Sequence, residues 1–306
     1  MSIQVSPSLL KGVEACPRAF HFRITKGLRG IQPGSEKMLI GQLVHSGLAF
    51  HYAGNSYERI EEIIRKEHEI YFSNMNDKSS MDDVLATVLR ILDRYIHKEG
   101  KLYDETENLV PITVETPFEI NLLCGASVIG VIDLVALSHV NVKKKGTMIY
   151  DHKITGSSNT TRFYGNPEGD IQVIIYLWAA KHVGLDPIAF VHNFVIHTMK
   201  SVTVQRNPTP YNPAVNDRMM DRLNYFLETL MKVKSDTIED ILRLPGNPGA
   251  CRMCPFTIIC DARSLKAAEL AVQIGFTVST YLDFEEIIRA KHNQKLLETQ
   301  HGKNDV

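Results

Sequence analysis

Several features are scarce in this sequence, and each absence excludes a class of protein. The 306 residues include only five cysteines, an odd number that does not suit a disulfide framework. No apolar run approaches the roughly 18 residues that cross a bilayer, and the opening MSIQVSPSLLKGVEACP lacks the apolar core of a signal peptide. The G-x4-G-K-[ST] pattern of a P-loop is also missing. We therefore expect a cytoplasmic protein with no membrane partner and no nucleotide-driven motor of its own.

An excess of charge of one sign is missing as well. The chain carries 34 basic and 35 acidic side chains, which gives a formal net charge of -1. Any site for a polyanion must then be a local patch. Hydrophobic residues make up 44% of the chain and charged residues 23%, values that are ordinary for a globular protein with a large core. They favour one large domain or two small ones and exclude a disordered chain.

Hydrophobic periodicity predicts the order of the helices and strands. Helices are expected over 6–23, around 37–53, in two charged stretches within about 50–103, and over 169–184, 216–234 and about 280–298. Strands are expected over 109–122, 126–138, 146–156, 187–199 and 201–207. This order indicates an α/β fold, with a mixed central sheet flanked by helices and an inserted helical layer.

Acidic residues stand in two neighbouring predicted strands. Asp133 interrupts an otherwise apolar strand, where its carboxylate loses hydration unless another group compensates it. Asp151 and Lys153 lie in the next strand as D-x-K, so the two-residue period places both side chains on one face, with His152 turned away. If the two strands pair, Asp133 comes beside Asp151, and adjacent carboxylates stay ionised only with a cation such as Mg2+ or Mn2+ between them. A buried Asp–Lys ion pair is the simpler alternative.

Three side chains on predicted helices are candidates for the same cleft. His45 follows Gly41 as G-x3-H, and an imidazole can complete a metal site that two carboxylates begin. A lone helical histidine is more often structural. Gln172 and Tyr176 are spaced i, i+4 and project from one face of the helix that follows the D-x-K strand. The ordinary alternative for this pair is a solvated helix face.

Taken in order, these residues resemble the PD-(D/E)XK nuclease superfamily in its RecB-like branch. More narrowly, they resemble the iron–sulfur exonucleases of that branch, a type that includes the fourth CRISPR-associated protein and phage relatives. The matching segments are SPSLLKGVEACPRAF, GQLVH, GVIDLV, YDHKITG, Q-x3-Y and C-x2-C-P-F-x4-C. The resemblance implies a restriction-endonuclease-like nuclease domain over 1–262, with a helical insertion at about 50–105, a C-terminal cysteine-cluster segment and a helical extension over 263–306.

The resemblance also implies a role for each residue of the cleft. The ligands of Mg2+ or Mn2+ would be His45, Asp133, Asp151 and the backbone carbonyl of His152. The catalytic residues would be Asp133, Asp151, Lys153, Gln172 and Tyr176, with Lys153 as the catalytic lysine. The family usually has Glu at the position of Asp151, and the shorter Asp is an accepted variant that would change the geometry of the metal site.

The cysteines form a pattern of their own. Cys251, Cys254 and Cys260 are arranged as C-x2-C-x5-C, Cys16 stands near the N-terminus, and Cys124 in an apolar run is expected to be a core residue. Four thiolates suit either an iron–sulfur cluster or zinc. The resemblance implies a [4Fe-4S] cluster on Cys16, Cys251, Cys254 and Cys260, with zinc as the alternative. Such a site would join segments that are more than two hundred residues apart.

The expected function is that of a Mg2+- or Mn2+-dependent deoxyribonuclease of the exonuclease type, acting in DNA recombination, end processing or DNA degradation. Its partner would be DNA, as single strands or duplex ends, and any helicase or recombination protein would be a separate chain. An oligomer is compatible with the resemblance. Two alternatives remain, a catalytically inactive DNA-binding or assembly subunit with the same fold and a zinc-stapled metallohydrolase that acts on a small substrate.

A local basic patch is a candidate for DNA contact. It consists of Arg18, Arg23, Lys26 and Arg29, with Phe20 and Phe22 between them. Such a patch can contact phosphates and stack on bases. Helical spacing predicts that some of these aromatic rings belong to the core instead.

Overall fold

The computed structural model describes residues 4–13, 16–30, 36–72, 78–139, 145–156 and 169–278. The chain divides into two compact units. The sheet unit comprises Gly34–Phe118 and Gly130–Met219, and the terminal unit comprises Met1–Pro33, Glu119–Ile129 and Met220–Val306. None of the helices in the described ranges has the length and apolar character that a bilayer crossing requires. The helix predicted at about 280–298 lies outside the described residues.

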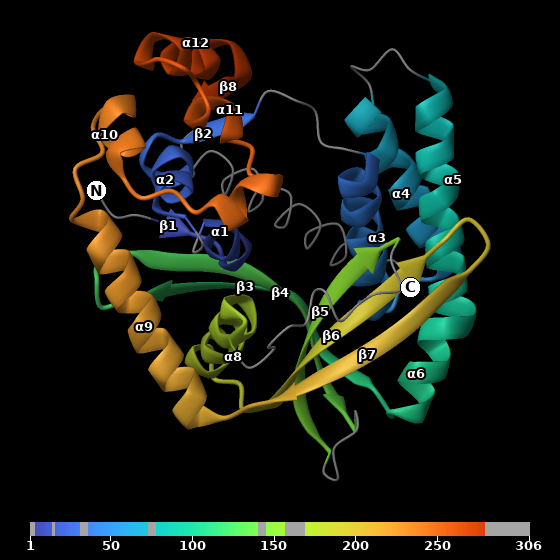
Figure 1. Cartoon of the computed structure of the whole chain (residues 1–306). Helices are drawn as coiled ribbons and strands as arrows, with labels where there is room; N and C mark the ends of the chain where they lie inside the picture. Colours follow the sequence, from blue (N-terminus) through green and yellow to red (C-terminus); the bar gives the residue numbers. More distant parts are fainter. Residues whose placement is uncertain are drawn as a thin grey trace. The chain divides into compact units, whose positions relative to one another are not determined.

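The sheet is mixed, as the sequence predicts. Its strands are β1 (Gln4–Val5), β3 (Val110–Asn121), β4 (Ser127–Ser138), β5 (Gly146–Thr155), β6 (Pro187–His197) and β7 (Val202–Pro210). The hydrogen-bonded order is β1-β4-β5-β6-β7, and β3 also pairs with β4 (Figure 1). The β4–β5 and β6–β7 pairs are antiparallel, whereas β5 and β6 are parallel. The five strands predicted from the sequence are confirmed.

Helix α8 (Ile171–His182) makes the parallel pairing of β5 and β6 feasible, because parallel neighbours need a long crossover connection. The helix begins at Asp170, whose carboxylate accepts the Gln172 backbone N–H at 2.9 Å. It ends before Gly184, whose φ of +83° is a conformation that glycine adopts without strain. The crossover therefore sets α8 against β5 and β6, and Gln172 in its first turn contacts Asp151 and Lys153.

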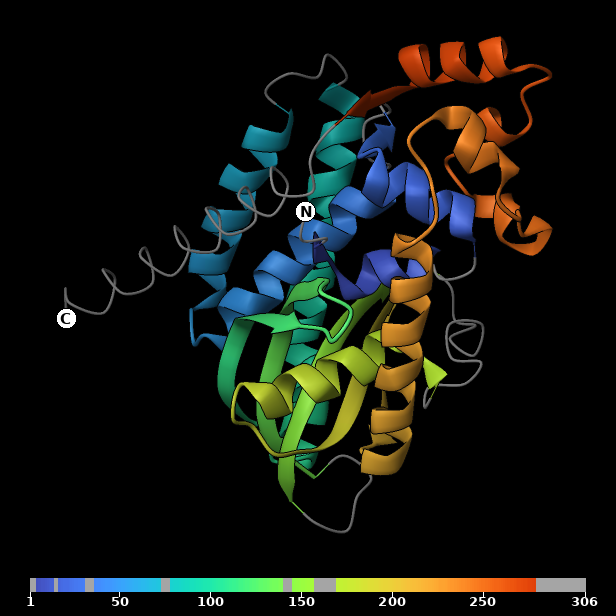
Figure 2. The same ribbon diagram turned by 90° about the vertical axis from the view of Figure 1, so that its left-hand side faces the viewer.

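A helical layer covers the other face of the sheet (Figure 2). It consists of α3 (Glu36–Tyr52), α4 (Tyr57–Phe72), α5 (Lys78–Arg94), the π-helix η2 (Tyr95–Glu99) and α6 (Gly100–Thr106). Its apolar side chains share one core with Met148 and Tyr150 of β5. Gly47 lets α3 approach α5 closely, since a Cβ at this position would lie 2.5 Å from a Leu92 methyl carbon. The helical insertion predicted from the sequence thus packs against the sheet.

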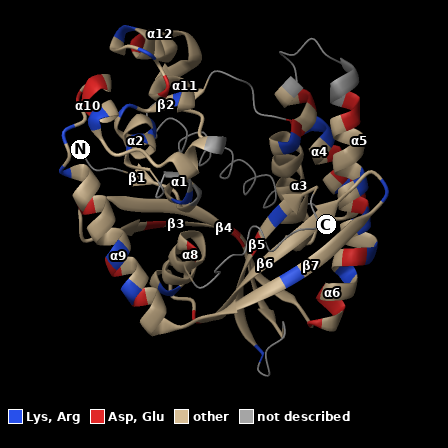
Figure 3. Ribbon diagram, viewed as in Figure 1, with Lys and Arg blue, Asp and Glu red and all other residues tan. Residues whose placement is uncertain are grey.

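The solvent side of this layer carries mixed charge. Basic and acidic positions both occur along α4, α5 and α6 (Figure 3). Lys66 Nζ, for example, lies 2.8 Å from Glu62 Oε1 one helical turn away. Exposed i, i+4 pairs of this kind stabilise a helix by roughly 0.3–0.5 kcal/mol each. The mixed pattern is typical of a solvated helix face.

The terminal unit contains short helices and a second sheet. Its helices are α1 (Pro7–Val13), α2 (Pro17–Phe20), the π-helix η1 (His21–Thr25), most of α9 (Pro213–Met231), α10 (Ile238–Arg243), the 3-10 helix η4 (Pro248–Met253), α11 (Thr257–Cys260) and α12 (Leu265–Gly275). Strand β2 (Leu28–Gly30) pairs antiparallel with β8 (Phe276–Val278). This pairing joins the segment after residue 263 to the N-terminal part of the chain.

Two expectations for this unit are wrong. The single helix predicted over 6–23 is interrupted at Cys16, which is extended (φ -151°, ψ 113°). The cause is Pro17, because a proline disfavours helical geometry in the residue before it. Cys124 is half-buried in the turn between β3 and β4, next to Gly125 with a φ of +82°, and is not a buried strand residue.

Candidate active site in the sheet unit

The pairing of β4 with β5 brings the two predicted acids together. Leu134 pairs with Tyr150, and the next residues along these two antiparallel strands are Asp133 and Asp151. The Asp133 carboxylate accepts the backbone N–H of His152 at 2.8 Å. Both acids come from regular strands, which hold their side chains more firmly than loops do.

Lys153 contacts Asp151 on the same face of β5. Its Nζ lies 3.0 Å from Asp151 Oδ1 and 2.8 Å from Oδ2. Gln172, in the first turn of α8, completes a triangle of side chains. Its Oε1 accepts from Lys153 Nζ at 3.2 Å, and its Nε2 donates to Asp151 Oδ1 at 3.3 Å. The N-cap Asp170 positions this first turn, and the two-residue period of the strand explains why Asp151 and Lys153 meet.

His45 reaches the site from α3. Its Nδ1 lies 3.4 Å from Asp133 Oδ2, and about a third of the His45 side chain is exposed. The His152 side chain points to the other face of the sheet, where it stacks on Tyr52. The structure therefore brings His45, Asp133, Asp151, Lys153 and Gln172 together, while only the backbone of His152 faces the acids.

Tyr176 lies one turn after Gln172 on α8, in an aromatic cluster. Its ring stands edge-on to Phe118 at 5.8 Å and stacks on Phe190 at 5.9 Å. The side chain is 8% exposed. Burial, and then the charges of Asp151 and Asp133, raise the pKa of Tyr176 well above its usual value. Its hydroxyl thus stays protonated beside Gln172.

Burial and charge act against the ionised form of Asp133. Burial raises the pKa of Asp133 above its usual value, and the charge of Asp151 raises it further. His45 and the backbone N–H of His152 act in the opposite direction but do not cancel these effects. An added cation would relieve this repulsion between the two carboxylates.

Lys153 remains charged in spite of its surroundings. Burial alone would lower the pKa of Lys153, but the charge of Asp151 and the hydrogen bond to it outweigh burial and raise the pKa. Asp133 and Asp170 add to this effect. The site therefore combines two carboxylates with one permanent ammonium group.

The donors of this site are hard oxygen atoms, which suit Mg2+ or Mn2+. Asp151 Oδ2 is buried and makes no hydrogen bond of normal geometry with any described residue, although Lys153 Nζ is close to it. This oxygen can accept a further cationic partner. Across the described ranges, however, no three His, Cys, Asp or Glu side chains converge as the ligands of one ion. The ligand set predicted from the sequence thus remains a proposal.

The four predicted cluster cysteines are free thiols in the terminal unit. Burial raises the pKa of Cys254, and the thiols of Cys16 and Cys251 add to the effect. Burial likewise raises the pKa of Cys260, which Arg18 counteracts by a hydrogen bond. The thiols are thus close enough to interact electrostatically. The described residues do not bring three of them together as ligands of one ion, so the iron–sulfur cluster is not confirmed.

The basic patch near the N-terminus is largely structural. Three of its side chains bind backbone carbonyls of the terminal unit: Arg18 Nε binds Leu244 O at 2.7 Å, Lys26 Nζ binds Asp236 O, and Arg29 Nη1 binds Arg23 O at 2.9 Å. Phe20 and Phe22 are completely buried. Stacking of these two rings on bases is therefore excluded, because they belong to the core.

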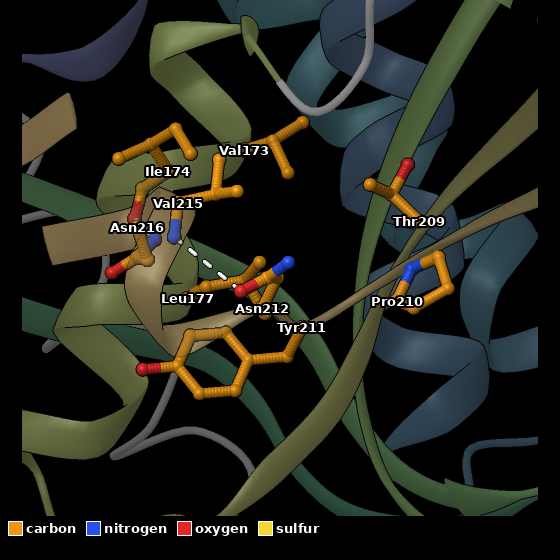
Figure 4. A pocket seen from close by; sticks show the side chains of 9 residues that line it. All are labelled: Val173, Ile174, Leu177, Thr209, Pro210, Tyr211, Asn212, Val215 and Asn216. Atoms are coloured by element: carbon orange, nitrogen blue, oxygen red, sulfur yellow. Dashed lines mark hydrogen bonds between the residues drawn. The ribbon is translucent and has the colours of Figure 1, made fainter. Parts of the chain in front are cut away.

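A small pocket beside α8 contains none of the predicted site residues (Figure 4). Its lining is Val173, Ile174, Leu177, Thr209, Pro210, Tyr211, Asn212, Val215 and Asn216. In the figure, the Val215 N–H donates to Asn212 Oδ1 across 3.4 Å. Val173 and Leu177 point from a different side of α8 than Gln172 and Tyr176 do. We therefore place the candidate active site at the acids of β4 and β5.

Sequence reasoning missed a set of buried polar residues behind the site. Arg206 of β7 is 4% exposed, and Asn193 of β6 is completely buried. One signal for Arg206 was available. It alternates with Val202 and Val204, so the two-residue period places this charged side chain on the buried face of its strand.

Comparison with known proteins identifies the family. The sequence model of the PD-(D/E)XK nuclease superfamily matches residues 4–261. The chain therefore belongs to this superfamily, whose members are nucleases that typically use divalent cations. The mixed sheet, with its paired acids and adjacent lysine, is consistent with the superfamily's fold.

Solved structures show more distant likeness. A protein described as a "putative exonuclease" from Eubacterium rectale has a TM-score of 0.48 and 13% identity, over 81% of this chain and 86% of its own. The protein SSO0001 has a TM-score of 0.28 and 16% identity, over 65% of this chain and 81% of its own. No curated protein matches the chain.

Proposed function

We propose that this chain is a Mg2+- or Mn2+-dependent DNA nuclease of the exonuclease type. One observation carries the proposal: Asp133 and Asp151 stand on neighbouring antiparallel strands, and Lys153 contacts Asp151 on the same face. In a chain that belongs to a nuclease superfamily, this arrangement supports phosphodiester hydrolysis. The ordered motifs of the iron–sulfur exonucleases support cleavage from DNA ends.

Each residue of the cleft then has a distinct task. Asp133 and Asp151 would hold the cation, with His45 and the backbone carbonyl of His152 as further ligands. A bound divalent cation supplies Lewis-acid activation of the phosphodiester and of the attacking water. The Lys153 ammonium would stabilise negative charge that develops on the phosphate. Gln172 would fix the positions of Lys153 and Asp151 through its hydrogen bonds to both side chains. The protonated Tyr176 would support Gln172 from the next turn of α8.

A nuclease assay with end-labelled DNA tests this function. Single and double strands labelled at the 5′ or 3′ end would be incubated with the protein and Mg2+ or Mn2+. We expect Asp151→Ala and Lys153→Ala to lower the rate by about 10²-fold or more. Lys181→Ala, an exposed substitution further along α8, serves as the control and should retain full activity. Equal digestion by the wild type and both site variants would refute the assignment.

The same assay separates an exonuclease from its alternatives. An exonuclease degrades linear DNA and spares closed circular DNA of the same sequence, whereas an endonuclease cuts both. A wild-type protein that binds DNA but digests neither form with either metal would instead be the inactive binding or assembly subunit.

We further propose that Cys16, Cys251, Cys254 and Cys260 bind a [4Fe-4S] cluster, with zinc as the alternative metal. The electrostatic interaction among these thiols supports their binding to one shared metal centre. Metal analysis of protein purified without oxygen distinguishes the two cases. About four iron atoms per chain indicate the cluster, and a single zinc indicates a zinc staple. A protein without either metal would contradict the proposal.

A further inference from the structure

A row of buried polar side chains crosses the sheet behind the acids. His152, Asn193 and Arg206 are register partners on β5, β6 and β7. They are 2%, 0% and 4% exposed, respectively. Strand side chains alternate, so this row lies on the face opposite Asp151 and Lys153, under the helical layer. Buried polar groups cost free energy unless they are hydrogen-bonded. In this row, Arg206 bonds to Asn193 and Asn193 bonds to His152.

The hydrogen bonds of the row determine the orientation of each member. Arg206 Nε lies 3.2 Å from Asn193 Oδ1, and Asn193 Nδ2 lies 2.7 Å from His152 Nδ1. A guanidinium only donates, so the atom of Asn193 that it meets must be the amide oxygen. The amide nitrogen then faces His152 and donates, so His152 Nδ1 accepts and the neutral ring carries its proton on Nε2. Arg206 thus sets the tautomer of His152 through Asn193.

The other end of Arg206 is held by the helical layer. Its Nη1 donates to Glu107 Oε2, and its Nη2 donates to Asp104 Oδ1. The hydroxyls of Tyr52 and Tyr95 each lie 3.2 Å from Nη2. The guanidinium therefore connects the row to α3, η2 and α6 at once.

Tyr52 carries this connection back to the acids. Its ring lies parallel to that of His152, with centroids 5.7 Å apart and planes at 3°. Tyr52 and His45 are seven residues apart on α3, two helical turns, and so lie on one face of the helix. His45 Nδ1 and the His152 backbone N–H both contact Asp133 Oδ2, at 3.4 and 2.8 Å. The His152 N–H belongs to a residue of the row, and His45 lies on the same helix as Tyr52, whose hydroxyl contacts Arg206.

We propose that Asn193 and Arg206 are positioning residues of the candidate active site. They hold the His152 side chain directly and hold α3 through Tyr52, so that His45 and the His152 N–H keep fixed places around the Asp133 carboxylate. This inference rests on the proposed function. Outer partners of this kind typically change metal affinity or activity by about 10- to 100-fold when they are removed.

The first test needs no nuclease activity. Histidine 15N chemical shifts distinguish the two neutral tautomers, and a His152→Gln spectrum identifies the signals of His152. We expect the Nε2–H tautomer alone in the wild type. In Asn193→Leu, we expect both tautomers, because the donor to Nδ1 is gone. A wild-type ring that carries its proton on Nδ1, or exchanges between tautomers, would overturn the inference even if every variant failed to fold.

The second test measures kinetics at a temperature where all variants are folded by circular dichroism. Asn193→Leu should raise the Mn2+ concentration for half-maximal activity by about 10-fold or more, with KM for DNA unchanged. Tyr52→Phe, which loses only the hydroxyl bound to Arg206, should change it in the same direction. The matched control is Asn224→Leu, since the Asn224 amide donates to Met220 O one turn earlier in α9, at 3.0 Å.

The outcomes separate this inference from the proposed function. Equal shifts in Asn193→Leu and Asn224→Leu would show that the row contributes only to general stability and would overturn the inference. A change in KM for DNA alone would overturn it as well. A wild type that digests no DNA with any metal would refute the proposed function, whereas the tautomer measurement would still test the row.

Discussion

Replacing Asp133 by asparagine should change stability in opposite directions with and without a divalent cation. Without metal, the substitution removes a charge that burial and Asp151 disfavour. Asparagine keeps an oxygen that can accept the His152 N–H. With metal, the substitution removes a ligand. The sign of the effect therefore reports whether the two acids share a cation.

The size of each effect follows from the geometry. Cross-strand neighbours have Cβ atoms about 5 Å apart, and two unit charges at that distance repel by about 3 kcal/mol at an effective dielectric constant of 20. Lys153 and His45 offset part of this repulsion, so we expect Asp133→Asn to stabilise the metal-free protein by about 1 kcal/mol. Mn2+ at 100 times its Kd stabilises the wild type by about 2.7 kcal/mol, or roughly 5 to 11 °C in Tm.

The pH dependence provides an independent check of the sign. The folded-state pKa of Asp133 is raised, so the folded protein binds this proton more tightly than the unfolded chain does. The stability of the metal-free wild type should therefore fall as pH rises from the ordinary carboxyl pKa through the raised one, and stay lower above it. Asp133→Asn should lack this decrease.

The assay is thermal unfolding with and without Mn2+, recorded from pH 4 to pH 8 on both proteins. Asp186→Asn is the control, since this carboxylate is 94% exposed and far along the chain from the acids. It should leave Tm and its metal response unchanged. An equal rise in Tm on Mn2+ addition in the wild type and Asp133→Asn would refute the reasoning, as would a metal-free variant less stable than the wild type.

Three further substitutions test a buried ion-pair cluster, a close contact between two helices and a helix cap. Arg206→Met should cost about 3–5 kcal/mol in urea unfolding, because it removes the guanidinium from the buried Glu107 carboxylate and the partly buried Asp104 carboxylate. A loss below about 1 kcal/mol would contradict the ion-pair account. Gly47→Ala should cost up to about 2 kcal/mol, because a gain of about 1 kcal/mol in helix propensity offsets part of the overpacking against Leu92 (about 1–3 kcal/mol). A stabilised variant would show that Leu92 moves freely. Thr237→Ala should cost about 1 kcal/mol by removing the capping box with Asp240, whereas an unchanged denaturation midpoint would show that the cap contributes nothing.

Much of the fold could be predicted because its signals are local. β-branched runs mark the strands, and Asp170 and Gly184 mark the ends of α8. The placement of Asp151 and Lys153 on one face needs only the period of a strand. The helix predicted over 6–23 was wrong although its breaking signal, Pro17, is equally local.

The support behind the site could not be predicted in the same way. A buried Arg206 follows from the alternation of β7, but its partners do not. Asn193, Tyr52 and Asp104 come from three other elements and meet only when the strands take up one register and the helices settle on them. A shift of one residue in the β6–β7 pairing would turn Arg206 away from Asn193.

The sequence by itself determined which residues share a strand face or a helix turn, because such relations extend over only a few residues. It therefore placed Lys153 beside Asp151 and Gln172 one turn from Tyr176. Only the tertiary structure decided that His45 of α3 lies against Asp133 and that a polar row supports it from behind. Those contacts join residues about 90 positions apart or cross three strands, and they depend on the packing of the whole sheet unit, which no short segment encodes.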